Sequence, residues 1–145
     1  MKTWFKLDSP ECLPTRAHQW DAGADLKSTV DTSIPPGAMR VVDTGVSVKI
    51  PVGYVGLVFS RSSMGKAQVT LANSVGVIDE SYRGNIKVMI QNNSPDNYYE
   101  IKKGDRICQL VVIPVIFPEI LEYTGPLEYW NDTARGQNGF GSSGK

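Results

Sequence analysis

Short apolar runs separated by turn residues recur along most of this chain. In several of them apolar and polar residues alternate with the period of two that marks a strand with one buried face. The run at residues 54–59 is apolar throughout, which favours a strand buried on both faces. The segments that we expect to form strands are residues 4–7, 39–44, 45–50, 54–59, 86–90, 107–113 and 116–121.

Turn signals punctuate these strands at intervals of roughly 8–12 residues, the spacing typical of a β-sandwich or barrel. Examples are the segments 35–37, 51–53 and 94–97, which are rich in proline, glycine, asparagine and aspartate. Helical periodicity is weak, and residues 62–65 have room for a turn or two of helix at most. We therefore predict an all-β sandwich of the jelly-roll type that forms one domain over residues 1–132.

Composition and charge restrict the function classes. The 145 residues carry 15 basic and 15 acidic side chains, and this zero balance argues against a nonspecific nucleic-acid binder. No apolar run approaches the ~20 residues of a membrane span, and charges interrupt the first twenty residues where a secretion signal would lie. We expect a cytoplasmic, soluble protein whose Cys12 and Cys108 are reduced, with a disulfide as the minor alternative.

Residues 133–145 have a composition unlike the rest of the chain. Within the run 135–144 lie Arg135, Phe140 and two hydroxyl residues among four glycines, too few apolar groups to form core. A disordered tail would have this composition. A mobile arm that closes over a ligand would have it too, because glycines let backbone N–H groups approach phosphates, arginine adds charge and an aromatic ring can stack on a base.

Two polar clusters fall where the strand pattern breaks in the first half of the chain. Asp25 sits among small residues, as a turn aspartate or as a carboxylate with space for a ligand. Arg61, Ser62 and Ser63 follow the apolar run at 54–59 after one residue, Ser60. They fit a phosphate cradle, and they fit equally a serine helix cap beside a solvated arginine.

Two further clusters lie in the second half. Asp79 follows small and apolar residues in a segment where we expect two strands to form a hairpin, so we expect Asp79 at the edge of a pocket and out of bulk water. There it could act as general base toward a bound water, with Tyr82 sharing the pocket; the alternative is an Asp-led β-turn. Gln109 alternates inward on an apolar strand and needs either a backbone partner or a ligand.

Taken in order, these clusters resemble the five motifs of the homotrimeric dUTPases, the deoxyuridine 5′-triphosphate nucleotidohydrolases. The family patterns are roughly AGxDL, RSS or RSG, GxIDxxYRG, GDRIxQ and RGxxGFGSxG. The matching segments here are residues 22–26, 61–63, 76–84, 104–109 and 135–144, so the resemblance spans nearly the whole chain.

The resemblance implies a β jelly roll that assembles as a homotrimer with active sites at the subunit interfaces. It implies Mg²⁺-assisted hydrolysis of dUTP to dUMP and pyrophosphate, in which Asp79 orients and deprotonates the water that attacks the α-phosphorus. Tyr82 would pack under the deoxyribose and leave no room for a 2′-hydroxyl. The other implied contacts are Asn73, Gly76 and Val77 to uracil, Arg61, Ser62, Ser63 and Gln109 to the triphosphate, Asp25 to the metal through water, and Arg135, Phe140, Gly141 and Ser142 from the arm.

The chain departs from the family pattern at a few positions, among them Asn85, where many members carry an acid after YRG. Two other functions stay open at this point. A dCTP deaminase shares the trimeric β scaffold and a similar Arg-Ser-Ser segment, although the arm and Tyr82 favour the triphosphatase. A β-sandwich that binds a nucleotide as a regulatory switch without turnover is the other.

Overall fold

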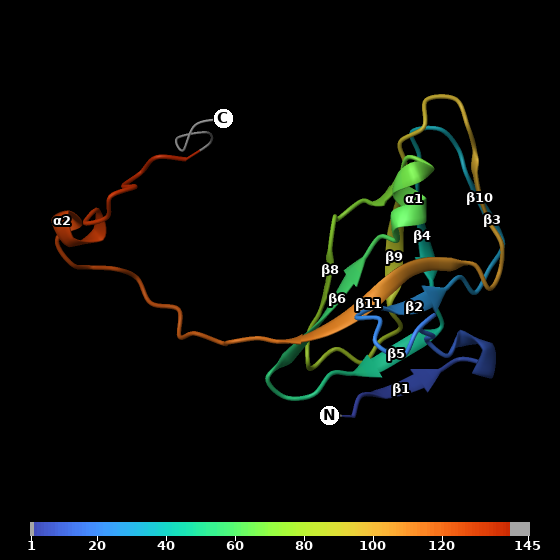
Figure 1. Ribbon diagram of the computed structural model, residues 1–145, viewed down its shortest axis with the longest axis horizontal. Coiled ribbons are helices and arrows are strands. Elements are labelled where there is room, and N and C mark those ends of the chain that lie inside the picture. Colours follow the sequence, from blue (N-terminus) through green and yellow to red (C-terminus); the bar gives the residue numbers. More distant parts are fainter. Residues whose placement is uncertain (1, 140–145) are drawn as a thin grey trace.

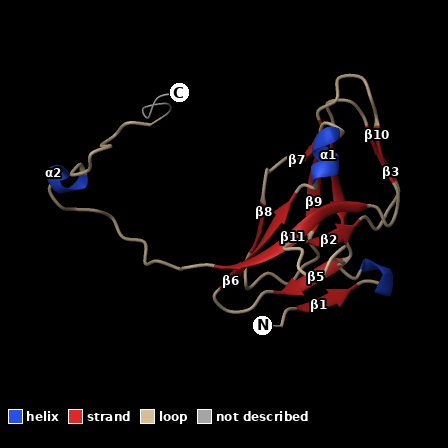
Figure 2. Ribbon diagram, viewed as in Figure 1, coloured by secondary structure: helices blue, strands red, loops and turns tan. Residues whose placement is uncertain are grey.

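The computed structural model describes residues 2–139. Its elements are β1 (Trp4–Leu7), a 3-10 turn η1 (Pro10–Cys12), β2 (Ala24–Lys27), β3 (Thr32–Ile34), β4 (Met39–Asp43), β5 (Val46–Lys49), β6 (Tyr54–Phe59), α1 (Ser62–Lys66), β7 (Val69–Leu71), β8 (Gly76–Ile78), β9 (Lys87–Asn92), β10 (Tyr99–Ile101), β11 (Arg106–Pro114) and α2 (Leu127–Trp130). Strands dominate the body of the molecule, as Figures 1 and 2 show. The predicted all-β, jelly-roll-like sandwich is confirmed.

Two sheets carry most of the fold. The larger has the order β2-β11-β6-β8 and the smaller the order β4-β9-β7, with the pairs β1-β5 and β10-β3 beside them. All the strand pairs are antiparallel. Side chains from both larger sheets, such as Leu26, Val58, Leu110, Val42 and Ile90, belong to one buried cluster. This shared core is what fixes the relative position of the strands that carry the polar clusters.

The predicted strand at 116–121 is wrong. The segment leaves β11 and continues without strand pairing, and Figure 1 shows it running away from the body toward α2. Ile116 and Ile120 are 87% and 94% exposed. Apolar alternation indicates a face that could be buried, but a strand also needs a neighbour for its backbone N–H and C=O groups, and this segment has none among the described residues.

The expected hairpin before Asp79 is also wrong. β7 pairs with β9 in the smaller sheet, whereas β8 pairs with β6 in the larger one. The turn at residues 72–75 therefore crosses from one sheet to the other, with Ser74 at a positive φ of 61°. We call it the sheet-crossing turn.

No helix among residues 2–139 is long and apolar enough to cross a membrane. Cys12 and Cys108 are both buried and free, as expected. Burial, together with the nearby Asp25 carboxylate, raises the pKa of the Cys108 thiol to about 12. This thiol is therefore a core group rather than a nucleophile.

Candidate functional site

An acid–arginine pocket is formed where β2, β11 and the start of α1 meet. Its volume is about 340 Å³, and the residues that line it are Ala17, Asp21, Ala22, Gly23, Asp25, Arg61, Ser62, Arg106 and Gln109. Asp25 and Gln109 lie opposite each other in the β2–β11 register, and Gln109 lies opposite Phe59 of β6. Antiparallel pairing thus places the first, second and fourth sequence clusters side by side.

Asp25 is the centre of this pocket, and its side chain is only 15% exposed. Arg61 donates from Nε to Asp25 Oδ1 at 2.9 Å, and Arg106 donates from Nη1 to Asp25 Oδ2 at 3.3 Å. Both carboxylate oxygens are therefore engaged by guanidinium groups within the chain. Such charge-assisted contacts hold two arginine side chains in one geometry without any ligand.

Arg61 is fixed by more than its carboxylate partner. Its Nη1 lies 3.4 Å from Ser63 Oγ and 3.4 Å from the carbonyl oxygen of Arg106. Ser62 and Ser63 form the first turn of α1, where backbone N–H groups have no partner within the helix. The three residues predicted together from sequence therefore present guanidinium, hydroxyl and N–H donors at one place.

Gln109 has a backbone partner. Its Nε2 donates to the carbonyl oxygen of Ser60 at 3.1 Å. Its Oε1 lies where a side chain at Gly23 would begin, since an added Cβ would be 2.3 Å away. Gly23 therefore leaves the space that the amide needs to reach the pocket wall.

Arg106 is the residue of this pocket that sequence reasoning missed. It lies within the segment 104–109 but received no role, although it reaches the same carboxylate as Arg61. The signal that could have found it is the bulge in β11, where one extra residue lies between Arg106 and Cys108. The bulge puts Arg106 opposite Lys27, on the same face as Asp25, and is visible only in the strand register.

A second, smaller pocket holds the aspartate and tyrosine of the third cluster. The aspartate–tyrosine pocket has a volume of about 160 Å³ and is lined by Val77, Ile78, Asp79, Tyr82, Ile86 and Lys87. Asp79 lies at its edge, but its side chain is exposed rather than out of bulk water as expected. The segment after β8 is a turn, because the N–H of Tyr82 donates to the carbonyl of Asp79 at 3.1 Å.

The sheet-crossing turn presents Asn73 beside this pocket. Asn73 is exposed, and its Nδ2 would be 3.8 Å from a Cβ placed on Gly76. Gly76 packs on Val58 of β6, where a Cβ would meet the valine at 3.2 Å. Val77 points the opposite way and is 62% exposed. The side chains of Asn73 and Val77 are thus both exposed, on either side of the glycine.

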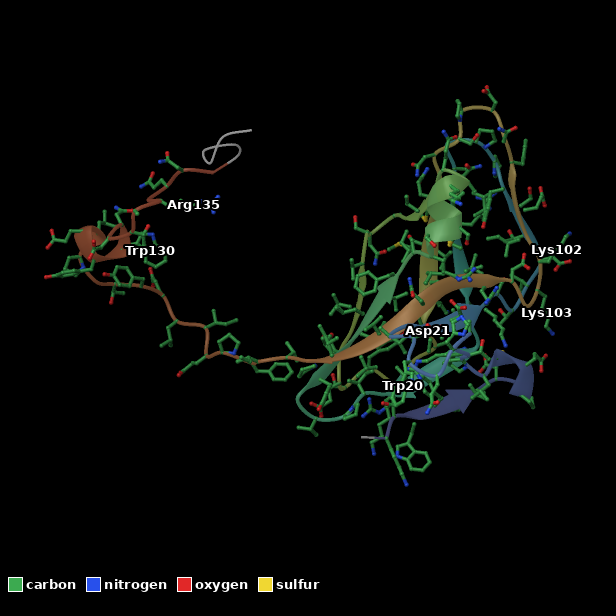
Figure 3. All side chains as sticks on the ribbon, viewed as in Figure 1. Trp20, Asp21, Lys102, Lys103, Trp130 and Arg135 are labelled. Carbon is green, nitrogen blue, oxygen red and sulfur yellow. The ribbon has the colours of Figure 1, made fainter. Side chains whose placement is uncertain are left out.

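The single chain does not bring the two pockets together. β2 and β8 are the opposite edges of the four-stranded sheet, so the strands that carry the pockets are about 14 Å apart at ~4.8 Å per strand. No residue in the described part of the chain lines both pockets. Figure 3 shows Arg135 still farther away, on the arm. Its Nε donates a hydrogen bond to the carbonyl of Asn138 at 2.9 Å. Phe140, Gly141 and Ser142 lie outside the described residues.

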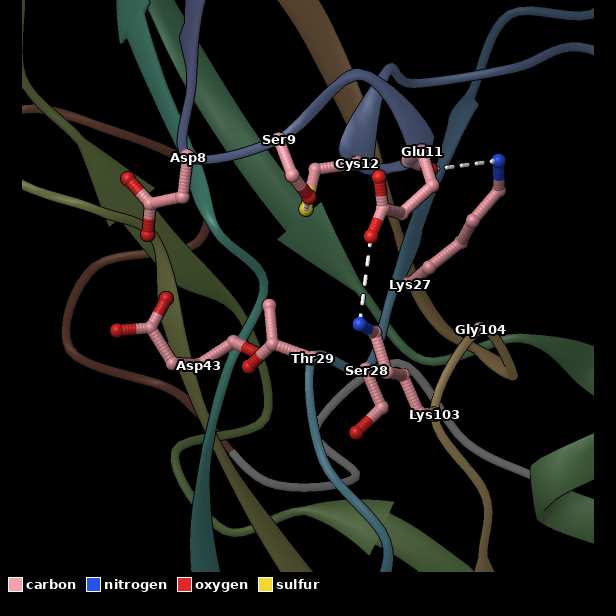
Figure 4. Close-up of a pocket in the computed structure, with 10 residues that line it drawn as sticks. All are labelled: Asp8, Ser9, Glu11, Cys12, Lys27, Ser28, Thr29, Asp43, Lys103 and Gly104. Atoms are coloured by element: carbon pink, nitrogen blue, oxygen red, sulfur yellow. Dashed lines mark hydrogen bonds and ion pairs between the residues drawn. The ribbon is translucent and has the colours of Figure 1, made fainter.

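A third pocket, the N-terminal pocket, contains none of the predicted residues. It has a volume of about 230 Å³, and Figure 4 shows its lining from Asp8 to Gly104. Glu11 forms an ion pair with Lys103 at 3.3 Å, while Lys27 donates to the carbonyl of Glu11 at 3.2 Å. Backbone and side-chain hydrogen bonds, including one with Ser9, lower the pKa of Glu11.

Comparison with known proteins gives one consistent likeness. The family described as dUTPase matches residues 10–144. A deoxyuridine 5′-triphosphate nucleotidohydrolase of Corynebacterium glutamicum is 43% identical over 141 residues, which cover 97% of this chain and 92% of that protein. One from Mycolicibacterium vanbaalenii is 45% identical over 141 residues and covers 96% of this chain and 92% of that protein.

Solved structures agree with these relatives. A mutant dUTPase of Staphylococcus bacteriophage 80alpha, solved with dUpNHpp, superposes with a TM-score of 0.87 at 31% identity and covers 99% of both chains. A mutant dUTPase from phage phi11 of S. aureus, in which a structural Mg(II) ion is coordinated, has a TM-score of 0.79 at 29% identity, covering 86% of this chain and 98% of that one.

Proposed function

The chain belongs to the dUTPase family, and from this premise we propose that it hydrolyses dUTP to dUMP and pyrophosphate in the presence of Mg²⁺. The observation that carries the proposal is the acid–arginine pocket. Two guanidinium groups, the exposed Ser62 and a glutamine amide line a cavity of about 340 Å³ there, and Ser63 contacts one of the guanidinium groups. Donors fixed in advance of the ligand are what a triphosphate requires, because phosphoryl chemistry depends on positioning and charge neutralisation.

Arg61, Ser62, Ser63 and Gln109 bind the triphosphate in this proposal, and Arg106 joins them. Arg61 already contacts Ser63 within the chain, so one phosphate can accept from both side chains at once. The pairing of both arginines with Asp25 lowers the net charge of the pocket and holds both guanidinium groups at one carboxylate. Phosphate oxygens then meet donors that need little reorganisation.

Asp79 is the proposed general base. It orients a water for attack on the α-phosphorus and takes its proton, for which an exposed carboxylate that lines the aspartate–tyrosine pocket is suited. Tyr82 lines the same pocket and would face the deoxyribose, so that a 2′-hydroxyl has no room. Asn73, Gly76 and Val77 would meet the uracil edge with the amide and backbone groups of the sheet-crossing turn.

Residues 133–145 are proposed to close over the bound nucleotide. Arg135 would reach the γ-phosphate, Phe140 would cover the uracil, and Gly141 and Ser142 would contact the phosphates. The support comes from the composition, and from the position of Arg135 on a segment that leaves the body of the molecule. A segment that becomes ordered on the ligand can exclude water during the reaction.

A homotrimer with active sites between subunits would unite what the single chain keeps apart. The two pockets sit on opposite edges of one sheet, and the segment after β11 carries Ile116, Phe117, Ile120 and Leu121 with more than two thirds of each exposed. Apolar exposure on this scale favours burial against another subunit. The pocket of one subunit and Asp79 of another could then face a single nucleotide.

Mg²⁺ fits this site as an ion held mainly by the substrate. Within residues 2–139 no cluster of three or more His, Cys, Asp or Glu side chains could hold a metal. Asp25 lines the acid–arginine pocket, and its oxygens already accept from Arg61 and Arg106, so it would contact the water shell of the ion rather than the ion. The ion itself supplies charge neutralisation on the phosphate oxygens.

The deciding experiment is a steady-state comparison of the purified protein with each deoxynucleoside triphosphate and Mg²⁺. We expect pyrophosphate release from dUTP and little from dCTP or dTTP. Ammonia release from dCTP would identify a deaminase and overturn the proposal. Tight binding of a nonhydrolysable dUTP analogue without turnover of dUTP would instead identify a nucleotide-binding regulator.

A further inference from the structure

The side chain of Asn85 ties the segment that carries Asp79 and Tyr82 to Ser47 in β5 and to Asp8 after β1. The Nδ2 of Asn85 donates to Asp8 Oδ2 at 2.6 Å, and its Oδ1 accepts from Ser47 Oγ at 2.8 Å. Ser47 is buried in β5, and Asp8 follows β1. The orientation of the amide is fixed by chemistry, because an ionised carboxylate can only accept and so must face the NH₂ group.

The same residue also holds Tyr82. The phenol hydroxyl donates to the backbone carbonyl of Asn85 at 2.9 Å. It passes over Gly84, where a Cβ would lie 2.6 Å from the hydroxyl oxygen. The next residue, Ile86, is buried, and its N–H donates to the carbonyl of Val46 at 2.7 Å. The ring of Tyr82 is therefore positioned by a carbonyl whose own place is set from β5.

Charge decides which residue suits position 85. Figure 4 shows Asp8 pointing away from Glu11 and the two lysines of the N-terminal pocket. The ion pairs among the described residues do not include Asp8. A carboxylate at position 85 would therefore stand at hydrogen-bond distance from an uncompensated carboxylate, and the two would repel each other.

We propose that Asn85 is a positioning residue, matched to Asp8, that sets the place of Tyr82 and thereby the discrimination between dUTP and UTP. The inference rests on the proposed function, and it assigns to the amide–carboxylate pair a role in selectivity. Tyr82 contacts the substrate; Asn85 acts through it. If Asn85 no longer pairs with Asp8, the ring of Tyr82 shifts and leaves room for a 2′-hydroxyl. The segment that carries Asp79 is then misplaced as well.

The test is a set of four variants assayed for kcat and KM with dUTP and with UTP. N85D puts two carboxylates together. We expect about a tenfold loss in kcat/KM for dUTP and a smaller ratio of kcat/KM for dUTP to kcat/KM for UTP. The exchange D8N/N85D restores a donor facing an acceptor, so we expect both quantities to return to near wild type. D8N alone gives the baseline for the exchange. N97D adds the same charge in the loop between β9 and β10 and should change neither quantity.

Thermal unfolding separates positioning from stability, because a purely structural role would lower the unfolding midpoint without changing the ratio of dUTP to UTP. A wild-type ratio in N85D, or an exchange variant that stays as impaired as N85D, overturns the inference. If N85D does not fold, Y82F is the deciding variant, because it removes the hydroxyl that donates to the Asn85 carbonyl. The inference requires that Y82F also lowers the ratio of kcat/KM for dUTP to kcat/KM for UTP. Wild-type protein that leaves dUTP intact refutes the proposed function instead.

Discussion

The acid–arginine pocket and the segment after β11 are built in opposite ways. In the pocket, Asp25, Arg61 and Arg106 satisfy one another across β2, α1 and β11. Along residues 116–139 nearly every side chain is exposed, and the hydrogen bonds and ring contacts lie within the segment, such as the ring pair of Tyr123 and Trp130 at 5.0 Å. One region has its geometry before any ligand arrives, whereas the other has apolar and cationic groups that still need a surface.

This difference separates two sources of binding energy. Donors that are already in place cost little further entropy when phosphates bind. A segment of exposed residues loses backbone and side-chain entropy when it is ordered, so a second subunit or the nucleotide has to compensate that loss. We infer that the pocket sets where the triphosphate binds and that the arm sets when the site is complete.

The largest effect is expected from Asp79→Asn, because Asp79 is the proposed general base. It lies in neither the acid–arginine pocket nor the segment after β11. We expect turnover of dUTP to fall about a thousandfold, while the affinity for a nonhydrolysable dUTP analogue stays within a few-fold of wild type. The reason is that the amide keeps the shape of the carboxylate but cannot accept the proton of the water. Pyrophosphate release and calorimetric titration measure the two quantities.

Glu80→Gln is the matched control for this variant, since it removes a neighbouring charge in the same turn and should leave turnover unchanged. Near-normal activity of the Asp79 variant would show that the base lies elsewhere, and the arginine pocket would then be the first place to search.

Two truncations test the arm. Removal of residues 133–145 should preserve the circular dichroism spectrum and the oligomeric mass but lower kcat/KM about a hundredfold, because only the closing segment is lost. Removal of residues 115–145 should also abolish the trimer, because it deletes the exposed apolar groups from Ile116 to Leu121. Sedimentation velocity measures the mass in both cases. These roles would be contradicted if the protein without residues 133–145 unfolds, or if the protein without residues 115–145 remains a trimer.

Arg61→Lys tests whether the pocket depends on geometry or on charge alone. Lysine keeps the positive charge but cannot contact Asp25, Ser63 and the carbonyl of Arg106 at the same time. We expect KM for dUTP to rise about tenfold with a smaller change in kcat. Lys66→Arg, on the far end of α1, is the control. An unchanged KM would mean that the three contacts of the Arg61 guanidinium do not contribute to binding dUTP.

The last prediction concerns stability rather than activity, and it depends on Cys108, next to Gln109 in β11. The thiol stays neutral in the folded protein up to its pKa of about 12 but ionises near 9 when unfolded. Stability from this group is thus complete below about pH 9 and is lost as the pH rises toward 12. The unfolding constant of wild type should rise relative to that of Cys108→Ala by up to roughly tenfold per pH unit in that window. Equal pH dependence of the two proteins would show that the thiol is not desolvated as the structure indicates.

Several elements could be predicted because their signal is local. The strands at β1, β4, β5, β6, β9 and β11 follow from apolar alternation between turn residues, and the short helix α1 from its serines after a buried strand. Gln109 was recognised as an inward polar group because its neighbours are apolar, and the backbone partner that it was expected to need is the carbonyl of Ser60.

The errors share a physical cause, which is that strand pairing is not local. Residues 116–121 have the apolar character of a strand but no neighbour to pair with. The segments on either side of residues 72–75 look like the arms of a hairpin, yet they pair with different sheets. Arg106 was overlooked because a bulge in β11, which no residue type announces, turns it toward Asp25.

Sequence alone thus determined the class of fold, the order of the polar clusters and the kinds of groups available, because periodicity and residue chemistry are properties of neighbouring positions. Tertiary structure decided which of these groups meet. The register of β2, β11 and β6 joins Asp25, Arg61 and Gln109 in one pocket, and the same sheet places Asp79 at its opposite edge. Backbone pairing between distant strands decides which polar groups meet. The residue types of one segment cannot determine that pairing, because it depends on the whole fold.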